Sequence, residues 1–207
     1  MAQMGFYFDS SVCTGCKACQ VVCQQKNDLP TGTLWRKVFH YGGGSWVDKG
    51  AYQVPEGVFR YYVSSACNHC AAPACVTVCP VDAIAKDPET GAVWIDEDVC
   101  NGCRSCEEAC PYAAPVINDE TGAEFKCDMC KDHLNEGILP ACVSTCNQRA
   151  LDFGDLEELK SKYPGTTNAI EPLPKATTGP SLLIKPHKDA QASGEGTGKI
   201  LNLQSEI

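Results

Sequence analysis

The chain has 207 residues, 16 of them cysteine, and a formal charge of −9 at pH 7. This acidity argues against a nucleic-acid partner, because a surface that binds phosphate groups is basic. The length allows one or two small domains, and no stretch approaches the roughly 18 apolar residues that a membrane-spanning helix needs.

In chain order, short β-prone runs alternate with four blocks of cysteines. One run precedes each block and another follows it, and the last cysteine of each block stands where a short helix is expected. Turn sequences at 87–91 and 119–122 predict hairpins, and residues 155–163 predict a helix capped by Asp155. The runs are 6–8 and 34–39, 61–63 and 83–85, 93–95 and 115–117, and 124–126 and 150–153. This order predicts an α+β fold like that of a two-cluster ferredoxin.

The cysteines form four blocks of four, with none left over. The first and third blocks have the spacing C-x-x-C-x-x-C-x-x-x-C, by which bacterial ferredoxins bind 4Fe-4S clusters. The second and fourth blocks widen the middle gap and keep the opening C-x-x-C and the closing C-x-x-x-C. The blocks are Cys13, Cys16, Cys19, Cys23; Cys67, Cys70, Cys75, Cys79; Cys100, Cys103, Cys106, Cys110; and Cys127, Cys130, Cys142, Cys146. All sixteen are predicted metal ligands, and four 4Fe-4S clusters are the predicted cofactors.

Two other uses of cysteine fit the pattern less well. Zinc sites take four thiolates in paired C-x-x-C motifs, and blocks of four at ferredoxin spacing exceed that need. Disulfide scaffolds are usually shorter than about 80 residues and lack such a repeated block. A cubane, by contrast, takes three soft thiolates from one loop and a fourth from a neighbouring block.

We find no catalytic constellation in the sequence. It contains no nucleophile with a positioned base and no glycine loop suited to phosphate, so the chain is expected to carry electrons and perform no bond chemistry. His69, between two ligands, is expected to lie near a cluster or on the surface and not to bind iron. Basic residues near the blocks are expected to be solvated, although they could also raise cluster potentials: Lys17, Arg104, Lys126 and Arg149.

Two segments lie outside the cysteine blocks. The insert 31–56 is expected to be a flexible loop or a docking surface, and Trp46 favours docking. Residues 164–207 contain five prolines and no periodic apolar face, so we expect an extended arm. Its apolar runs 181–184 and 200–203 favour an arm that lies along a partner, with a disordered tail as the alternative.

The segment from Met4 to about Asp155 resembles the iron–sulfur electron-transfer subunit of dimethyl sulfoxide reductase, in the molybdopterin oxidoreductase superfamily. Four blocks in this order, with the long gap in the fourth, are specific for that superfamily. Asn147 departs from the proline common after the last cysteine, and His133 from a common arginine, but neither change removes a ligand. The resemblance is carried by Cys13–Cys19, Ser65–Cys70, Pro73–Cys75, Asp96–Cys100, Lys126–Cys130, Pro140–Cys142, Arg149–Gly154, Pro172–Pro174 and Ile184–Pro186.

The resemblance implies that the first block pairs with the fourth, and the second with the third. The implied fold is two interleaved ferredoxin-like modules, 1–30 with 125–163 and 57–124, followed by the arm 164–207. The spacing alone leaves open the pairing of first with second and third with fourth. The implied ligand sets are Cys13, Cys16, Cys19 and Cys146; Cys67, Cys70, Cys75 and Cys110; Cys100, Cys103, Cys106 and Cys79; and Cys127, Cys130, Cys142 and Cys23.

The resemblance also implies an electron relay. Its partners would be a molybdopterin catalytic subunit and a membrane-anchored subunit that oxidises quinol, or another donor. The alternatives are the same role in a catechol dehydroxylase, polysulfide reductase or formate dehydrogenase complex, or a free-standing polyferredoxin shuttle.

The expected location follows from the cofactor and from the N-terminus. Cluster insertion needs reduced thiols, so we expect assembly in the cytoplasm, and residues 1–6 lack the pattern of a signal peptide. The implied position is peripheral on the cytoplasmic membrane, or exported with a signal-bearing partner; a cytoplasmic protein is the alternative.

Overall fold

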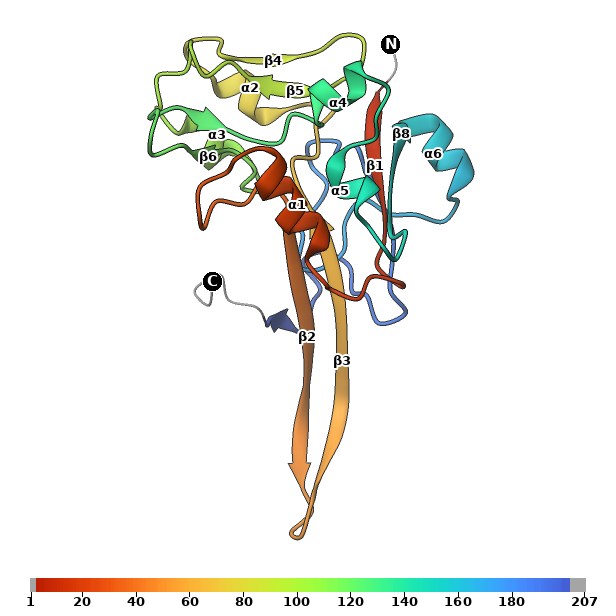
Figure 1. Ribbon diagram of the computed structural model, residues 1–207. Helices are drawn as coiled ribbons and strands as arrows, with labels where there is room; N and C mark the ends of the chain where they lie inside the picture. Colours follow the sequence, from red (N-terminus) through yellow and green to blue (C-terminus); the bar gives the residue numbers. More distant parts are fainter. Residues whose placement is uncertain (1–2, 202–207) are drawn as a thin grey trace.

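The computed structural model describes residues 3–201 and has a mixed helix and strand body from which one long hairpin projects (Figure 1). Each predicted β-prone run overlaps a strand, and a short helix lies in each cysteine block. The prediction that this helix carries the last cysteine holds only for Cys23; Cys79, Cys110 and Cys146 come just after their helices, because the segments around them are extended or turned. The elements are β1 (Met4–Asp9), α1 (Ala18–Lys26), β2 (Lys37–Asp48), β3 (Gln53–Ser65), α2 (Ala74–Val78), β4 (Ile84–Lys86), β5 (Val93–Ile95), α3 (Ser105–Ala109), β6 (Val116–Ile117), β7 (Glu124–Phe125), α4 (Lys131–Asn135), α5 (Ala141–Ser144), β8 (Leu151–Asp155), α6 (Leu156–Lys162), β9 (Leu182–Lys185) and β10 (Lys199–Ile200).

The central sheet has the order β8-β1-β9. β1 runs antiparallel to β8 and parallel to β9, and Phe6 is paired with both Phe153 and Leu182. Side chains alternate between the faces of a strand, so Phe6 and Phe8 enter the main core, while Tyr7 faces α6 and stacks on Tyr163. α6 is capped as predicted, because the Asp155 side chain accepts from the backbone N–H groups of Glu157 and Glu158.

The arm contributes a strand to this sheet, which corrects the expectation for its first apolar run. Ser181, Leu182, Leu183 and Ile184 are all buried, and Ile184 is 0% exposed. They are covered by this chain and not by a partner, because β1 offers a free edge to β9 and the main core takes up their side chains. The absence of a periodic face was misleading, since a buried strand has apolar residues on both faces.

The second and third cysteine blocks lie among smaller elements. β4 pairs with β5 and β6 with β7, each as an antiparallel hairpin at the predicted turns. α2 packs against α3, whereas α1 packs against α5. The second and third blocks therefore meet through one helix pair, and the first and fourth through another.

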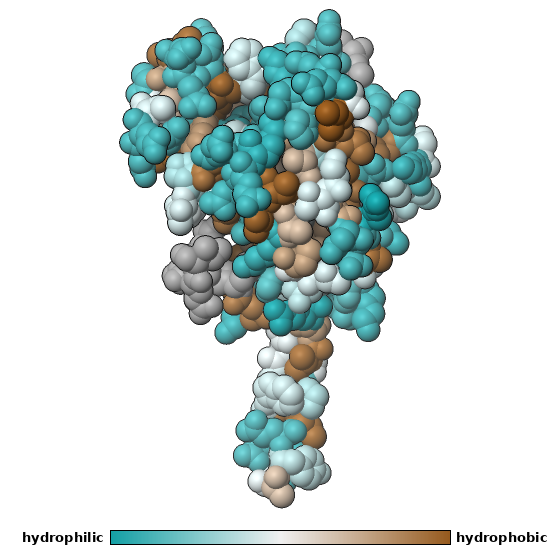
Figure 2. All heavy atoms as spheres, in the orientation of Figure 1, coloured by the Kyte–Doolittle hydropathy of each residue, from teal (hydrophilic) through white to brown (hydrophobic). Residues whose placement is uncertain are grey.

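The insert 31–56 is not a loop, because most of it belongs to the hairpin of β2 and β3. Their register is shifted between Gly43 and Ser45. The inner part of the hairpin is buried at Val38 and Val63, and the outer part exposes Trp46 (64%) and Val58 (53%). The outer part forms a narrow stalk with both apolar and polar residues (Figures 1 and 2).

The second apolar run of the arm, 200–203, begins in β10. This strand pairs with β2 at Tyr41 and Gly42. Ile200 and Leu201 are more than one-third exposed, and Asn202 and Leu203 lie outside the described residues. Within residues 3–201, no helix has the length and apolar character needed to cross a membrane.

Candidate metal centres

The cysteines gather at four places, here called sites 1 to 4, and each place combines residues from two blocks. Site 1 contains Cys13, Cys16, Cys19 and Cys146; site 2 contains Cys67, Cys70, Cys75 and Cys110; site 3 contains Cys79, Cys100, Cys103 and Cys106; site 4 contains Cys23, Cys127, Cys130 and Cys142. The cysteines of sites 1 to 3 each line one pocket. The cysteines of site 4 lie close enough for their thiols to raise one another's pKa values.

Site 1 lies between the loop before α1 and the segment after α5. Its pocket wall is apolar at Phe8, Val38 and Leu151. Cys19 Sγ is 3.4 Å from the Ser64 hydroxyl, whereas the Cys16 thiol is exposed. Burial raises the pKa of Cys13 to about 11, and neighbouring thiols of the same site add to the rise. The pocket thus shields three thiols and leaves one at the surface.

Several polar side chains lie in the wall of site 2. The Thr178 hydroxyl donates to Cys70 Sγ at 3.1 Å, which brings the arm to this site. His69 is fully buried; the Val93 N–H donates to its Nδ1 at 2.9 Å, and burial holds the pKa of the ring well below its usual value. Nδ1 accepts, so the neutral ring carries its proton on Nε2. Lys126 also lines this pocket.

Site 3 lies at the surface end of the small hairpins. The Glu124 N–H donates to Cys100 Sγ at 3.3 Å. Cys103 is exposed, and hydrogen bonds with the side chain and backbone of Ser105 lower the pKa of its thiol. Burial raises the pKa of Cys106 to about 12, and the Glu124 carboxyl adds to the rise.

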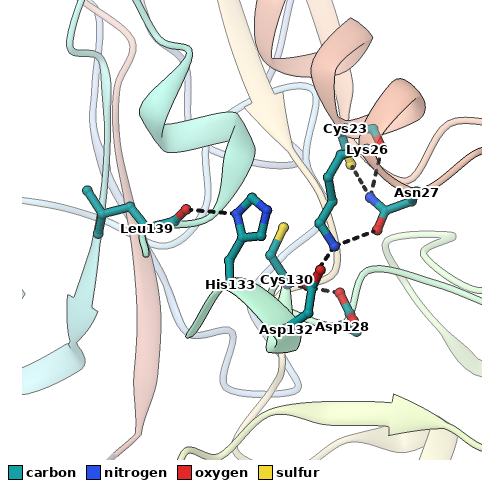
Figure 3. Close-up of polar contacts among 8 residues, drawn as sticks. All are labelled: Cys23, Lys26, Asn27, Asp128, Cys130, Asp132, His133 and Leu139. Carbon is teal, nitrogen blue, oxygen red and sulfur yellow. Dashed lines mark hydrogen bonds and ion pairs between the residues drawn. The ribbon is translucent and has the colours of Figure 1, made fainter. Parts of the chain in front are cut away.

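Site 4 is formed by α1, the residues after β7, and helices α4 and α5. Lys26 of α1 pairs with Asp132 of α4 at 2.6 Å, and the Asn27 amide donates to the Cys23 carbonyl at 2.8 Å (Figure 3). Burial raises the pKa of Cys23 to about 12, and the thiols of Cys142 and Cys130 add to the rise. The ion pair therefore links α1, which carries Cys23 of the first block, to α4 of the fourth block, and the Asn27 amide caps the end of α1.

The cysteine loops of the first and third blocks repeat one backbone conformation. Gly15 and Gly102 both have φ +67, and the residues two positions later, Lys17 and Arg104, both have φ +62. A side chain at Gly102 would meet the Gly122 carbonyl, and one at Gly15 would meet the Tyr62 ring. The glycine in each C-x-G-C motif is therefore needed for both its conformation and its size.

These residues fit iron–sulfur clusters. Thiolates are the ligands that such clusters take, and a buried polar atom in the wall of site 2, His69 Nε2, has no partner among the described residues, so it is available to an acceptor in the pocket. No three Cys, His, Asp or Glu side chains among residues 3–201 are placed to hold a single metal ion. The cysteines line pocket walls instead.

The four sites form a series in which neighbours share buried packing. Cys19 of site 1 and Cys142 of site 4 belong to the main core. Cys127 of site 4 and Cys67 of site 2 share another apolar cluster, and Cys75 of site 2 and Cys106 of site 3 share a third. The order is 1-4-2-3, and the exposed thiols Cys16 and Cys103 lie in the two outermost sites.

Two buried basic side chains lie near the sites. Lys126 is 4% exposed, so the expectation that it is solvated was wrong: its Nζ donates to the carbonyls of Val93 and Cys127. Arg36 is 2% exposed, and sequence reasoning missed it because it lies in a β-prone run, thirteen residues after the first block ends. Arg104 and Arg149 are exposed as expected.

Two family models of 4Fe-4S proteins match this chain. A family model for a 4Fe-4S dicluster domain matches residues 58–156, and one for a 4Fe-4S binding domain matches residues 10–32. Over 97% of both lengths, the protein is 46% identical to the B subunit of anaerobic dimethyl sulfoxide reductase and 47% identical to the probable anaerobic dimethyl sulfoxide reductase subunit YnfG, both from Escherichia coli strain K12. It is 44% identical to the corresponding B subunit of Haemophilus influenzae over 98% of both lengths.

The fold and its cysteine sites define a 4Fe-4S protein of the electron-transfer class. Within that class, this protein belongs to the family of iron–sulfur B subunits of anaerobic dimethyl sulfoxide reductases. It is an electron-transfer subunit of an oxidoreductase complex and not a catalytic one.

Proposed function

We propose that the protein binds four 4Fe-4S clusters and relays electrons between a quinol-oxidising membrane subunit and a molybdopterin catalytic subunit. The complex would be of the dimethyl sulfoxide reductase type, as the names of the relatives suggest. The observation that carries the proposal is the series of sites 1-4-2-3, in which each neighbouring pair shares buried packing and only the outermost sites expose a cysteine.

The proposed ligands are the cysteines of each site. Cys146 lines the pocket of Cys13, Cys16 and Cys19, and this supports pairing the first block with the fourth. Cys110 lines the pocket of Cys67, and Cys79 that of Cys100, which supports pairing the second block with the third. These pairings favour two interleaved ferredoxin-like modules, 1–30 with 125–163 and 57–124.

When bound, each cluster supplies a one-electron redox centre. The chain's own residues hold the ligands and exclude water: Phe8, Val38 and Leu151 do so at site 1, and Ile84 and Ala83 at site 3. The exposed Cys16 and Cys103 leave the outer two sites open to a partner's cofactor. The chain thus shields the series of sites from water and leaves only sites 1 and 3 accessible to the cofactors of its partners.

The hairpin supports a permanent partner. A two-stranded ribbon is at best marginally stable in water, and the outer part of β2 and β3 exposes Trp46, Val58 and the neighbouring Tyr52. We propose that this stalk docks on the catalytic subunit, which argues against a free shuttle. A catechol dehydroxylase, polysulfide reductase or formate dehydrogenase partner is the alternative within the same role.

The decisive experiment compares the two ends of the series in the purified complex. Cys16→Ser and Cys103→Ser each alter one outermost site. We expect one variant to block reduction of the remaining clusters by a quinol analogue, and the other to permit that reduction but block turnover. Both variants having the same effect would contradict the linear order.

Iron and acid-labile sulfide analysis of the wild-type chain tests the cofactor itself. Four cubanes are expected, that is about sixteen irons per chain. One zinc per block without labile sulfide would reject the proposal. Cys146→Ser should perturb the same spectroscopic signal as Cys13→Ser, and a match with Cys79→Ser would instead reject the pairing.

A further inference from the structure

Arg36 is a buried charge without a carboxylate partner among residues 3–201. It is among the largest fully buried side chains and precedes β2. Arginine stays protonated in proteins, and an uncompensated buried charge costs several kcal/mol. None of the ion pairs among residues 3–201 includes Arg36, and its Nε has no hydrogen-bond partner there. The negative charge that offsets this cation must come from another kind of group.

The hydrogen bonds of Arg36 lead to cysteines of two different sites. Its backbone N–H donates to the Cys23 thiol of site 4. Its side-chain Nη1 donates to the Ser64 hydroxyl at 3.2 Å, and that hydroxyl lies 3.4 Å from Cys19 Sγ of site 1. The guanidinium is also 5.0 Å from the centre of the Phe6 ring, which fixes its position within the core. Arg36 therefore lies between sites 1 and 4.

The electrostatic surroundings agree with this geometry. Burial by itself lowers the pKa of Arg36, but the nearby thiols outweigh it, so that the pKa is raised. The thiols with the largest effects are those of Cys142, Cys19, Cys127 and Cys23. One belongs to site 1 and three to site 4. Thiolates bound to a cluster carry negative charge, and the net charge around a cluster helps to set its reduction potential.

We propose that Arg36 is the shared counter-charge of sites 1 and 4, placed to raise the reduction potential of both clusters and to weaken their mutual repulsion when both are reduced. This inference rests on the proposed function. Arg36 acts as a positioning residue, since its charge reaches both ligand sets from one buried place. Site 3 is outside its contacts and serves as the internal control. Site 2 is reached at its wall, where the charge of Arg36 helps to lower the pKa of His69.

The test measures the four midpoint potentials of the whole complex by redox titration with electron paramagnetic resonance. Signals are assigned with the serine variants of the ligands. Arg36→Gln should make the midpoint potentials of sites 1 and 4 more negative by about 59 mV. For a one-electron couple, this shift lowers the equilibrium constant for reduction about tenfold. The potential of site 3 should not change, and that of site 2 should change less than those of sites 1 and 4. Arg36→Lys, which keeps the charge, should shift sites 1 and 4 much less than Arg36→Gln does.

Arg149→Gln is the matched control. It removes the same charge beside site 1, where Arg149 N–H bonds to the Cys146 carbonyl at 3.0 Å, but its side chain is exposed and screened by water. We expect little shift. The inference is overturned if Arg36→Gln shifts no potential, shifts all four equally, or matches Arg36→Lys.

If the Arg36→Gln protein fails to incorporate its clusters, two further variants test the inference. Arg36→Lys should then incorporate all four clusters. Ser64→Ala should shift the midpoint potential of site 1 more than that of site 4, because Ser64 contacts Cys19. Failure of Arg36→Lys to load would show that shape and not charge is required, and would overturn the inference. Failure of the proposed function is distinguishable, because it would already appear as missing clusters in the wild type.

Discussion

The two parts of the body are held together by different means. The core half contains the sheet β8-β1-β9 with α1, α5 and α6, and its apolar cluster includes Phe6, Phe8 and Ile184 among many other buried side chains. The cluster half contains α2, α3 and β4 to β7, and its cluster of buried residues consists of Ile84, Val93 and two cysteines, Cys75 and Cys106. Small domains with little core need metals or similar cross-links. The core half is stabilised by side-chain packing, whereas the cluster half depends on its metal centres.

The largest expected effect is that of removing iron. After anaerobic chelation, hydrogen exchange in β4 to β7 should rise to nearly that of an unfolded chain, because the cluster half loses the ligand bonds that replace a core. Amides of β1 should stay protected by the central sheet. Exchange followed by mass spectrometry would check this, and equal loss of protection in β1 and β5 would break the comparison.

A charge in the central sheet should destabilise the core half. Ile184→Asp places a carboxylate in a fully buried position and should cost at least about 4 kcal/mol, measured as the free energy of unfolding in denaturant. The matched control is Ile200→Asp in β10, which is 38% exposed and should cost much less. Similar losses for both would show that the arm does not contribute to the core as its burial implies.

Gly15 and Gly102 occupy equivalent positions in the two halves, so substitutions there allow the stability of the halves to be compared. Gly102→Ala places a methyl group against the Gly122 backbone at positive φ, and should cost about 2–5 kcal/mol from conformation and overlap together. Gly15→Ala meets the half-buried side chain of Tyr62 and not backbone, so its cost should be smaller. Chemical denaturation and the signal of site 3 would report both, and a larger loss for Gly15→Ala would reverse the comparison.

Lys126 links the end of β7 to β5 within the cluster half and should give the smallest effect. Its Nζ donates to Val93 of the cluster half and to the carbonyl of Cys127. Lys126→Met keeps the buried chain length but leaves the Val93 carbonyl without this donor, at about 1–3 kcal/mol. Thermal unfolding of the loaded chain would measure the loss. Lys188→Met, at an exposed position, should change stability by less than about 0.5 kcal/mol.

The sequence by itself determined the local parts of this protein. The cysteine spacing identified all sixteen cysteines that gather at sites 1 to 4, because three proposed ligands of each cluster come from a single block. The strands around the blocks and the helix capped by Asp155 were also predictable, since turn and capping signals are local. The family followed from the same motifs.

Only the tertiary structure decided what each segment packs against. β9 lies beside β1 although about 175 residues separate them, and a parallel pair has no turn signal to announce it. The hairpin of β2 and β3 was hidden by the glycines 42–44, which suggested a loop. Arg36 lies outside every cysteine motif, and its place between two sites depends on Ser64 and Phe6, brought together from distant strands. Ligand spacing is a local property of the sequence, whereas burial depends on which distant segments pack into one core.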